Sequence, residues 1–221
     1  MPASFPFPWF EPLLARLREH LSLEPSPRDA AHDLGHLLRV ARLAHRLAKL
    51  EEADPEVCVA GALLHDLVYR PKNHPESPLT ARMAADLVLR WCQETPGLET
   101  RAQAIAAAVA SHSWSGGGAP ASREAAVVQD ADRLEALGAI GVARVFATGA
   151  SFGAGLWHPE DPWAEGRDLD DKAWSLDHFE RKLLRLEADM KTDAGRRLAV
   201  ARQHAMLAYL GALRAELGAN G

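Results

Sequence analysis

The segment VCVAGALLHD, residues 57–66, decides the fold predicted for this chain. Its eight small or apolar residues predict a buried helix. The preceding Asp54-Pro55-Glu56 supplies an N-cap, a proline suited to the first turn and an acidic residue. The helix then ends on His65 and Asp66. Because burying unpaired polar groups is costly, this pair needs a partner, and a divalent metal ion is the most economical one.

The remainder of the chain also has helical spacing, with apolar residues recurring every three to four positions and no alternating strand pattern. The sequence therefore predicts an all-α protein. The expected helices cover about residues 9–21, 29–50, 54–66, 77–94, 99–112, 122–137, 139–148, 176–190 and 192–217. A long irregular loop is expected near residues 149–172, and loops of such length are often functional.

Length and composition limit the class of protein. The 221 residues suffice for one domain over residues 1–221, with a core at about 29–137 and C-terminal helices at about 176–217 packed on it. A net charge of -5 gives no sign of a nucleic-acid or membrane surface. Two cysteines in helical patterns provide no disulfide framework, and no signal-peptide pattern is present. We expect a cytoplasmic monomer or homodimer that binds neither nucleic acid nor membranes.

Two further residues have the chemistry to join His65 and Asp66 at a metal ion. His36 lies in the apolar stripe of the helix predicted over 29–50, and Asp132 lies in the helix predicted over 122–137. The four side chains would form a set of two imidazoles and two carboxylates from three helices. Adjacent helical residues point about 100° apart, so His65 and Asp66 can share one ion only if it sits over the helix end.

Each of the distant ligands has a neighbour of the same type. His32 lies on the same helical face as His36 but in the first turn, so His36 is the better ligand. Asp130 and Asp132 point to nearly opposite sides of their helix, so one of them is the ligand. We predict one divalent ion, with Mn favoured and Mg, Ni, Co, Fe or Zn as alternatives, because imidazole with carboxylate suits such ions better than calcium. The absence of a thiolate argues against a closed structural zinc site.

Three short motifs resemble the HD-domain metal-dependent phosphohydrolases. They are HLLRVA at 36–41, LLHD at 63–66 and ADRL at 131–134. The resemblance extends to a small bacterial subfamily similar to pyrophosphohydrolases of deoxynucleoside triphosphates, through segments at 71–75, 111–115, 129–141 and 179–184. It implies a helical bundle that binds a metal through His36, His65, Asp66 and Asp132, and it implies a small nucleotide as substrate.

The chemistry expected of such a site is hydrolysis of nucleoside or deoxynucleoside triphosphates to monophosphate and pyrophosphate by a metal-activated water. Asp66 would polarise the water, and His112 and His32 are candidates for acid, base or second-metal ligand. Some HD enzymes place a glutamate just after the His-Asp pair, but residues 67–70 contain no carboxylate, so the general acid is unassigned. The candidate substrate-binding residues are Lys72, Asn73, Arg133 and Lys182.

Several alternatives remain open at this point. Lys72 and Asn73 lie between two prolines and also fit a simple turn. Arg133 also fits a helix ion pair, and Lys182 a solvated face. The same motifs suit a nucleotide phosphomonoesterase or phosphodiesterase, a non-catalytic module that binds nucleotide or metal, or a diiron oxygenase.

Overall fold

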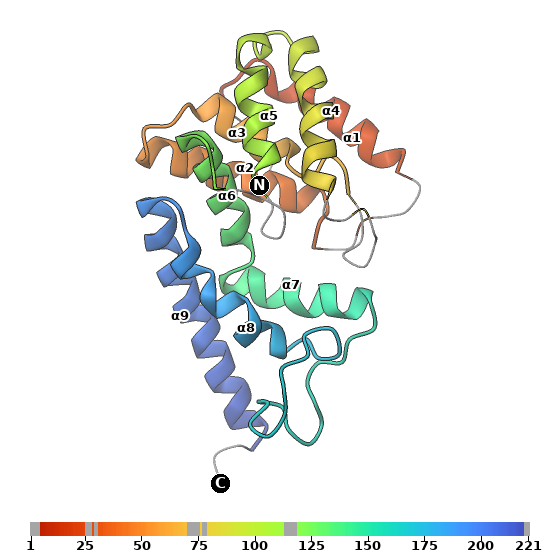
Figure 1. Ribbon diagram of the computed structural model, residues 1–221, viewed down its shortest axis with the longest axis vertical. Coiled ribbons are helices and arrows are strands. Elements are labelled where there is room, and N and C mark those ends of the chain that lie inside the picture. The colour runs from red at the N-terminus through yellow and green to blue at the C-terminus, as the bar shows by residue number, and fades with distance from the viewer. Residues whose placement is uncertain are drawn as a thin grey trace. The chain divides into compact units, whose positions relative to one another are not determined.

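The computed structural model describes residues 5–24, 28, 31–69, 76, 79–112 and 119–218. These residues form helices and irregular segments, with one isolated β-bridge, so the prediction of an all-α fold is confirmed. The chain divides into two compact units (Figure 1). The first contains residues 1–28 and 32–132, and the second contains residues 29–31 and 133–221.

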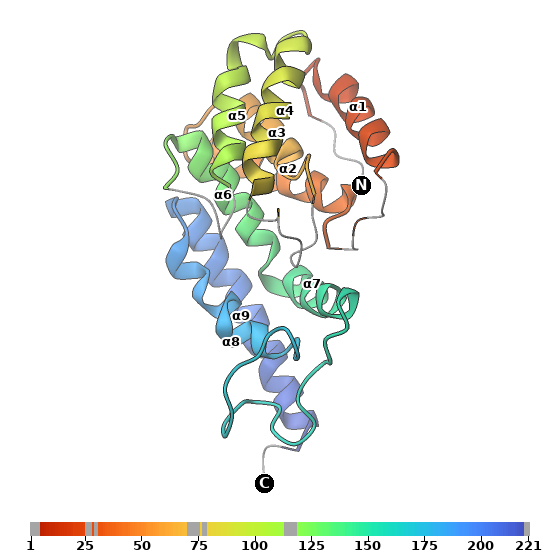
Figure 2. The ribbon, with the colours of Figure 1, turned by 45° about the vertical axis from the view of Figure 1, so that its right-hand side comes forward.

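The first unit is a bundle of α-helices. Its central helices α2 and α3 pack together, α3 also packs on α5, and α5 packs on α4, as both ribbon views show (Figure 2). A short 3-10 helix, η2 (Glu99–Arg101), leads directly into α5. The helices of this unit are α1 (Phe10–Ser22), α2 (Leu34–Leu50), α3 (Pro55–Leu64), α4 (Thr80–Glu94), α5 (Ala102–Ala110) and the greater part of α6 (Arg123–Glu135).

Helix α3 has the ends predicted from its sequence. The Asp54 carboxylate accepts hydrogen bonds from the backbone N–H groups of Glu56 and Val57, and every α3 residue from Val57 to Leu64 is buried. The helix ends at Leu64, so His65 follows directly at its C-cap. The cap and the apolar composition thus fix where the His-Asp pair leaves the helix.

Helix α2 begins later than its apolar pattern predicts. The prediction placed its start near residue 29, but residues 31–33 form a turn and the first helical residue is Leu34. The Asp33 carboxylate caps the helix by accepting a 2.8 Å hydrogen bond from the backbone N–H of His36. An aspartate with an extended backbone stops the helix there, although the apolar spacing continues.

The second unit contains α7 (Gly138–Ser151), α8 (Asp177–Arg181) and α9 (Asp193–Glu216), with α7 packed on α9. The single helix predicted over 176–190 is instead α8 followed by two 3-10 helices, η3 (Leu183–Arg185) and η4 (Glu187–Asp189). The expected irregular segment is present, but α7 continues to Ser151, so the segment begins at residue 152 rather than 149.

Hydrogen bonds hold this irregular segment in place. Backbone groups of Gly155 pair with those of Ala173 and Ser175 at 2.9 Å. The guanidinium of Arg167 donates two hydrogen bonds, of 2.5 and 2.7 Å, to the buried carboxylate of Asp177. The long loop is therefore an ordered part of the second unit.

Within the described part of the chain, no single helix is long and apolar enough to cross a membrane. The bent pair α6 and α7 meets that standard of length and composition only when taken together.

The organisation of the chain as one domain stays a prediction.

Candidate metal centre

A layer of small and branched side chains brings three helices of the first unit close together. A Cβ atom on Gly61 of α3 would lie 3.1 Å from Val128 Cγ2 of α6 and 3.7 Å from Ala108 Cβ of α5. The absence of a side chain at Gly61 therefore allows this close approach. One helical turn is about four residues, so the residues four positions after Gly61, Ala108 and Val128 also lie close together, one turn further along the helices. All three are polar. They are His65, His112 and Asp132.

The four predicted ligands come together at this end of the bundle. His65 Nε2 lies 3.4 Å from Asp66 Oδ2 and 3.6 Å from Asp132 Oδ1. His36 Nε2 lies 3.5 Å from the same Asp132 oxygen. His36, His65 and Asp66 each contribute one ligand atom, and these three atoms lie within 4.8 Å of one another. This spacing can hold a metal ion.

Hydrogen bonding sets the orientation of the His65 ring. Its Nδ1 donates a 2.8 Å hydrogen bond to the Ala62 carbonyl, so Nε2 is the nitrogen that faces the carboxylates. The side chain is 1 % exposed, and Nε2 makes no hydrogen bond within the described residues. A buried nitrogen of this kind, with two carboxylates beside it, has the donor chemistry that a divalent ion requires.

The charges of the cluster shift the pKa values of its members. Burial lowers the pKa of His65, but the carboxylates of Asp66 and Asp132 outweigh it and raise the pKa to about 9. Burial raises the pKa of Asp66, but His65 and His112 outweigh it and hold that pKa well below its usual range. The same balance, with His65 and His36 as the main cations, lowers the pKa of Asp132. The two carboxylates are therefore ionised near neutral pH.

His112 lies beside the four ligands at the end of α5. Its Nδ1 donates a 2.6 Å hydrogen bond to the Val109 carbonyl, and its Nε2 lies 3.6 Å from Asp66 Oδ1. Gln129 of α6 supports this position, because its Nε2 donates a 2.8 Å hydrogen bond to the carbonyl of Ser111, the residue just before His112. The sequence does not indicate this role of Gln129, because a polar residue near Asp132 gives no sign of a hydrogen bond to a carbonyl 18 positions away.

His32 lies beside His36, one of the four predicted ligands. Its ring centroid lies 5.9 Å from that of His36 and 5.5 Å from that of Tyr69. The sequence does not indicate that Tyr69 is a neighbour of the site. No periodic pattern could have identified it, because it follows the end of α3.

The predicted substrate residues are not brought to this cluster by any described contact. Arg133 Nη1 donates a 2.7 Å hydrogen bond to the Asp189 carbonyl, within the second unit. Lys182 lies half-buried at the C-terminal end of α8, in the same unit. Lys72 and Asn73 lie outside the described residues. A role in substrate binding for all four residues stays a prediction.

Comparison with known proteins identifies the family. The HD-domain family model matches residues 33–137. The uncharacterized protein YpgQ of Bacillus subtilis is 32% identical over 192 residues, which cover 85% of each chain. The chain belongs to the HD-domain family.

Two solved structures extend the comparison to almost the whole chain. The crystal structure of YpgQ in complex with ADP has a TM-score of 0.73 and 31% sequence identity, and 94% of each chain is covered. An HD-superfamily hydrolase from Bacillus thuringiensis has a TM-score of 0.69 and 28% identity, with 95% of this chain and 97% of that chain covered. The predictions of an HD-domain fold and of a hydrolase are confirmed.

Proposed function

We propose that this protein hydrolyses nucleoside or deoxynucleoside triphosphates to monophosphate and pyrophosphate, with one divalent metal ion as cofactor. The observation that carries the proposal is the buried His65 Nε2, which makes no hydrogen bond within the described residues and faces the carboxylates of Asp66 and Asp132. A nucleotide as the substrate class is supported by YpgQ, which was crystallised with ADP.

Four residues would hold the ion: His36, His65, Asp66 and Asp132. Their imidazole and carboxylate groups suit Mn²⁺, with Mg, Ni, Co, Fe or Zn as alternatives. A bound divalent ion lowers the pKa of a coordinated water and neutralises phosphate charge. The hydrogen bond from His65 Nδ1 to the Ala62 carbonyl keeps the ring in the orientation that presents Nε2 to the ion.

The reaction joins a water oxygen to the α-phosphorus of the substrate and breaks the bond from that phosphorus to the oxygen bridging to the β-phosphate. Asp66 orients the water and accepts its hydrogen bond. His112 presents Nε2 3.6 Å from Asp66 Oδ1, and we assign it to give a proton to the leaving pyrophosphate. His32 has the same chemistry and is the second candidate for that role.

The remaining parts of the proposal concern binding and location. Lys72, Asn73, Arg133 and Lys182 are proposed to hold the phosphates, because cationic and amide groups pair with phosphate oxygens. We further propose a cytoplasmic monomer or homodimer, in keeping with two buried cysteines that form no disulfide.

A metal-dependent substrate screen tests the proposal. The full chain is incubated with Mn²⁺ and separate nucleoside triphosphates, monophosphates and cyclic dinucleotides, and the products are separated by anion-exchange chromatography. Monophosphate and pyrophosphate in equal amounts are expected from triphosphates. Asp132→Asn should abolish turnover and lower the bound metal measured by atomic emission. Asp86→Asn, which changes an exposed aspartate on α4, is the matched control and should alter neither.

Other products would overturn specific parts of the proposal. Free phosphate from a monophosphate, or a linear dinucleotide from a cyclic one, would replace the triphosphate reaction by that of a monoesterase or diesterase. Tight nucleotide binding without turnover with any of the named metals would identify a binding module. Full activity of Asp132→Asn would show that the ligand set is wrong.

A further inference from the structure

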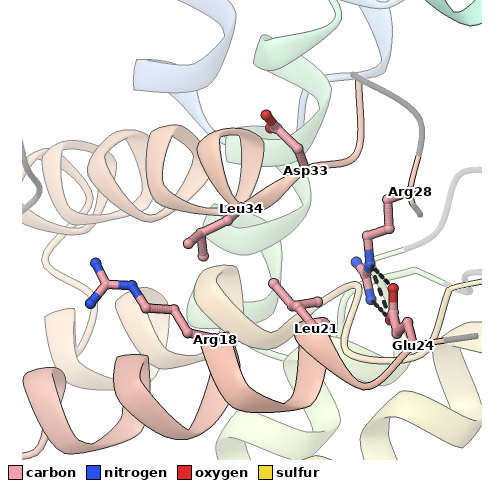
Figure 3. Close-up of a pocket in the computed structure, with 6 residues that line it drawn as sticks. All are labelled: Arg18, Leu21, Glu24, Arg28, Asp33 and Leu34. Atoms are coloured by element: carbon pink, nitrogen blue, oxygen red, sulfur yellow. Dashed lines mark hydrogen bonds and ion pairs between the residues drawn. The ribbon is translucent and has the colours of Figure 1, made fainter. Parts of the chain in front are cut away.

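A cavity of about 250 Å³ opens in the first unit between the end of α1 and the start of α2 (Figure 3). Leu21 and Leu34 give it apolar walls from the two helices, and the guanidinium of Arg28 lies beside Glu24 at one end. This volume is slightly below that of pockets for drug-sized ligands, so it suits one part of a nucleotide rather than a whole one. The lining residues are Arg18, Leu21, Glu24, Arg28, Asp33 and Leu34.

Arg28 has hydrogen-bonding capacity that no described residue uses. Its Nε and Nη2 donate to the Glu24 carboxylate at 2.9 and 2.6 Å. Its third nitrogen, Nη1, is buried and has no hydrogen-bond partner among the residues that the structure describes. The whole side chain is only 5 % exposed. Leaving such a donor unpaired is costly, so Arg28 points to a ligand with hydrogen-bond acceptors.

Side-chain contacts connect this cavity with the candidate metal centre. The guanidinium of Arg28 lies 5.3 Å from the Tyr69 ring centroid. Tyr69 lies 5.5 Å from His32, and His32 lies 5.9 Å from His36. Leu34, which lines the cavity, and His36 belong to the same helix, α2. A nucleotide whose phosphates lie at the metal centre can therefore direct its other end toward the cavity.

The chemistry of the cavity favours a neutral, flat group over a phosphate. The positive charges of Arg18 and Arg28 are balanced by Glu24 and Asp33, so there is no excess of positive charge for an anion. The leucines suit the faces of a ring. Arg28 Nη1 carries two N–H donors, which match two neighbouring acceptors on the edge of a base. Guanine presents such a pair in O6 and N7, whereas adenine presents a donor beside N7.

We propose that this cavity binds the base of a 6-oxopurine nucleotide, guanine or hypoxanthine, with Arg28 Nη1 donating to O6 and N7. The proposal rests on the proposed function, because it takes the phosphates to lie at the His-Asp cluster. It adds a base preference and a recognition residue. Arg28 keeps its ion pair with Glu24 while it binds the base, so no charge is left unpaired.

The test compares the affinities of the full-length protein for the non-hydrolysable α,β-methylene analogues of GDP, IDP and ADP by isothermal titration calorimetry with Mn²⁺, the ion that the proposed phosphate site holds. The ratio of dissociation constants cancels the contribution of the shared diphosphate. We expect the GDP and IDP analogues to bind about tenfold more tightly than the ADP analogue, as expected for one good pairing with a base edge. Arg28→Met should bring the ratio close to one, mainly by weakening the binding of the GDP and IDP analogues.

A matched control is available on α1. Arg16 also pairs with a glutamate, Glu94 at 2.8 Å, and lies 4.3 Å from the ring centroid of Trp91, but it does not line the cavity. Arg16→Met should leave the ratio unchanged. Leu34→Trp fills the cavity without removing the Arg28–Glu24 pair, so it should also bring the ratio of dissociation constants close to one. This variant tests the same cavity if Arg28→Met folds poorly.

The outcomes separate this inference from the proposed function. Equal affinities of the unchanged protein for the GDP and ADP analogues, or a preference that survives both Arg28→Met and Leu34→Trp, would overturn the base assignment even if triphosphates are hydrolysed. A preference that depends on Arg28 would support the assignment, even if the substrate screen shows no turnover and the proposed function falls.

Discussion

Replacing His112 by glutamine tests whether this side chain moves a proton or only holds Asp66 in place. His112 Nε2 lies 3.6 Å from Asp66 Oδ1, and its Nδ1 is held by the Val109 carbonyl. If His112 gives a proton to the leaving pyrophosphate, the variant should lose about 100- to 10,000-fold in kcat. If it only orients Asp66, the loss is one hydrogen bond to a charged group, roughly 1.5–3 kcal/mol, or about 10- to 150-fold.

Two substrates separate these explanations more sharply than the rate loss alone. Deoxythymidine triphosphate releases pyrophosphate, which benefits from a proton, whereas the p-nitrophenyl ester of thymidine 5′-phosphate releases a phenolate that needs none. With Mn²⁺ present, we expect His112→Gln to lose about 1,000-fold in kcat on the triphosphate and far less on the ester. His204→Gln, at an exposed position of α9, is the control and should keep the full rate on both.

The comparison has two results that would refute the reasoning. Equal losses on the two substrates would show that His112 gives no proton and acts only through Asp66. An unchanged kcat on both would remove His112 from the site altogether and leave His32 as the candidate acid.

Three further predictions concern stability, thiol reactivity and metal removal. Arg167→Met leaves the Asp177 carboxylate buried without its main partner and should lower the free energy of unfolding by about 3 kcal/mol in urea titrations. Burial raises the pKa of Asp177, but Arg167 outweighs it and lowers that pKa. The stabilisation from the ionised Asp177 is therefore present at neutral pH and is lost as pH falls through the folded-state pKa. Arg167→Met should weaken this dependence of the free energy of unfolding on acid pH. Burial raises the pKa of the Cys58 and Cys92 thiols, so both should react with a chromogenic disulfide at pH 8 only after unfolding, and rapid reaction of the native protein would contradict their burial. Mn²⁺ at 100 times its dissociation constant should add about 2.7 kcal/mol to the free energy of unfolding, and EDTA should reverse the gain in melting temperature; no shift would count against a metal site.

The sequence by itself determined the helical class, most helix positions and the end of α3. Asp54, Pro55 and the apolar run up to Leu64 act through local capping and burial, and their effects can be read from neighbours in the chain. The types and order of His36, His65, Asp66 and Asp132 match a known motif, so the sequence also predicts this set of metal ligands.

Only the tertiary structure decided which atoms meet. The packing of Ala108 and Val128 against Gly61 brings helices from distant parts of the chain to one level, and this places His112 beside Asp66. The helix predicted over 176–190 breaks at Lys182, where φ of -136° and ψ of -56° leave the helical range, and the apolar spacing of the sequence gives no sign of that break. Periodicity reports which face of a helix is apolar, whereas the partner of that face depends on contacts between residues far apart in sequence. For the same reason, the sequence alone does not show that Arg28 Nη1 is buried without a hydrogen-bond partner among the described residues.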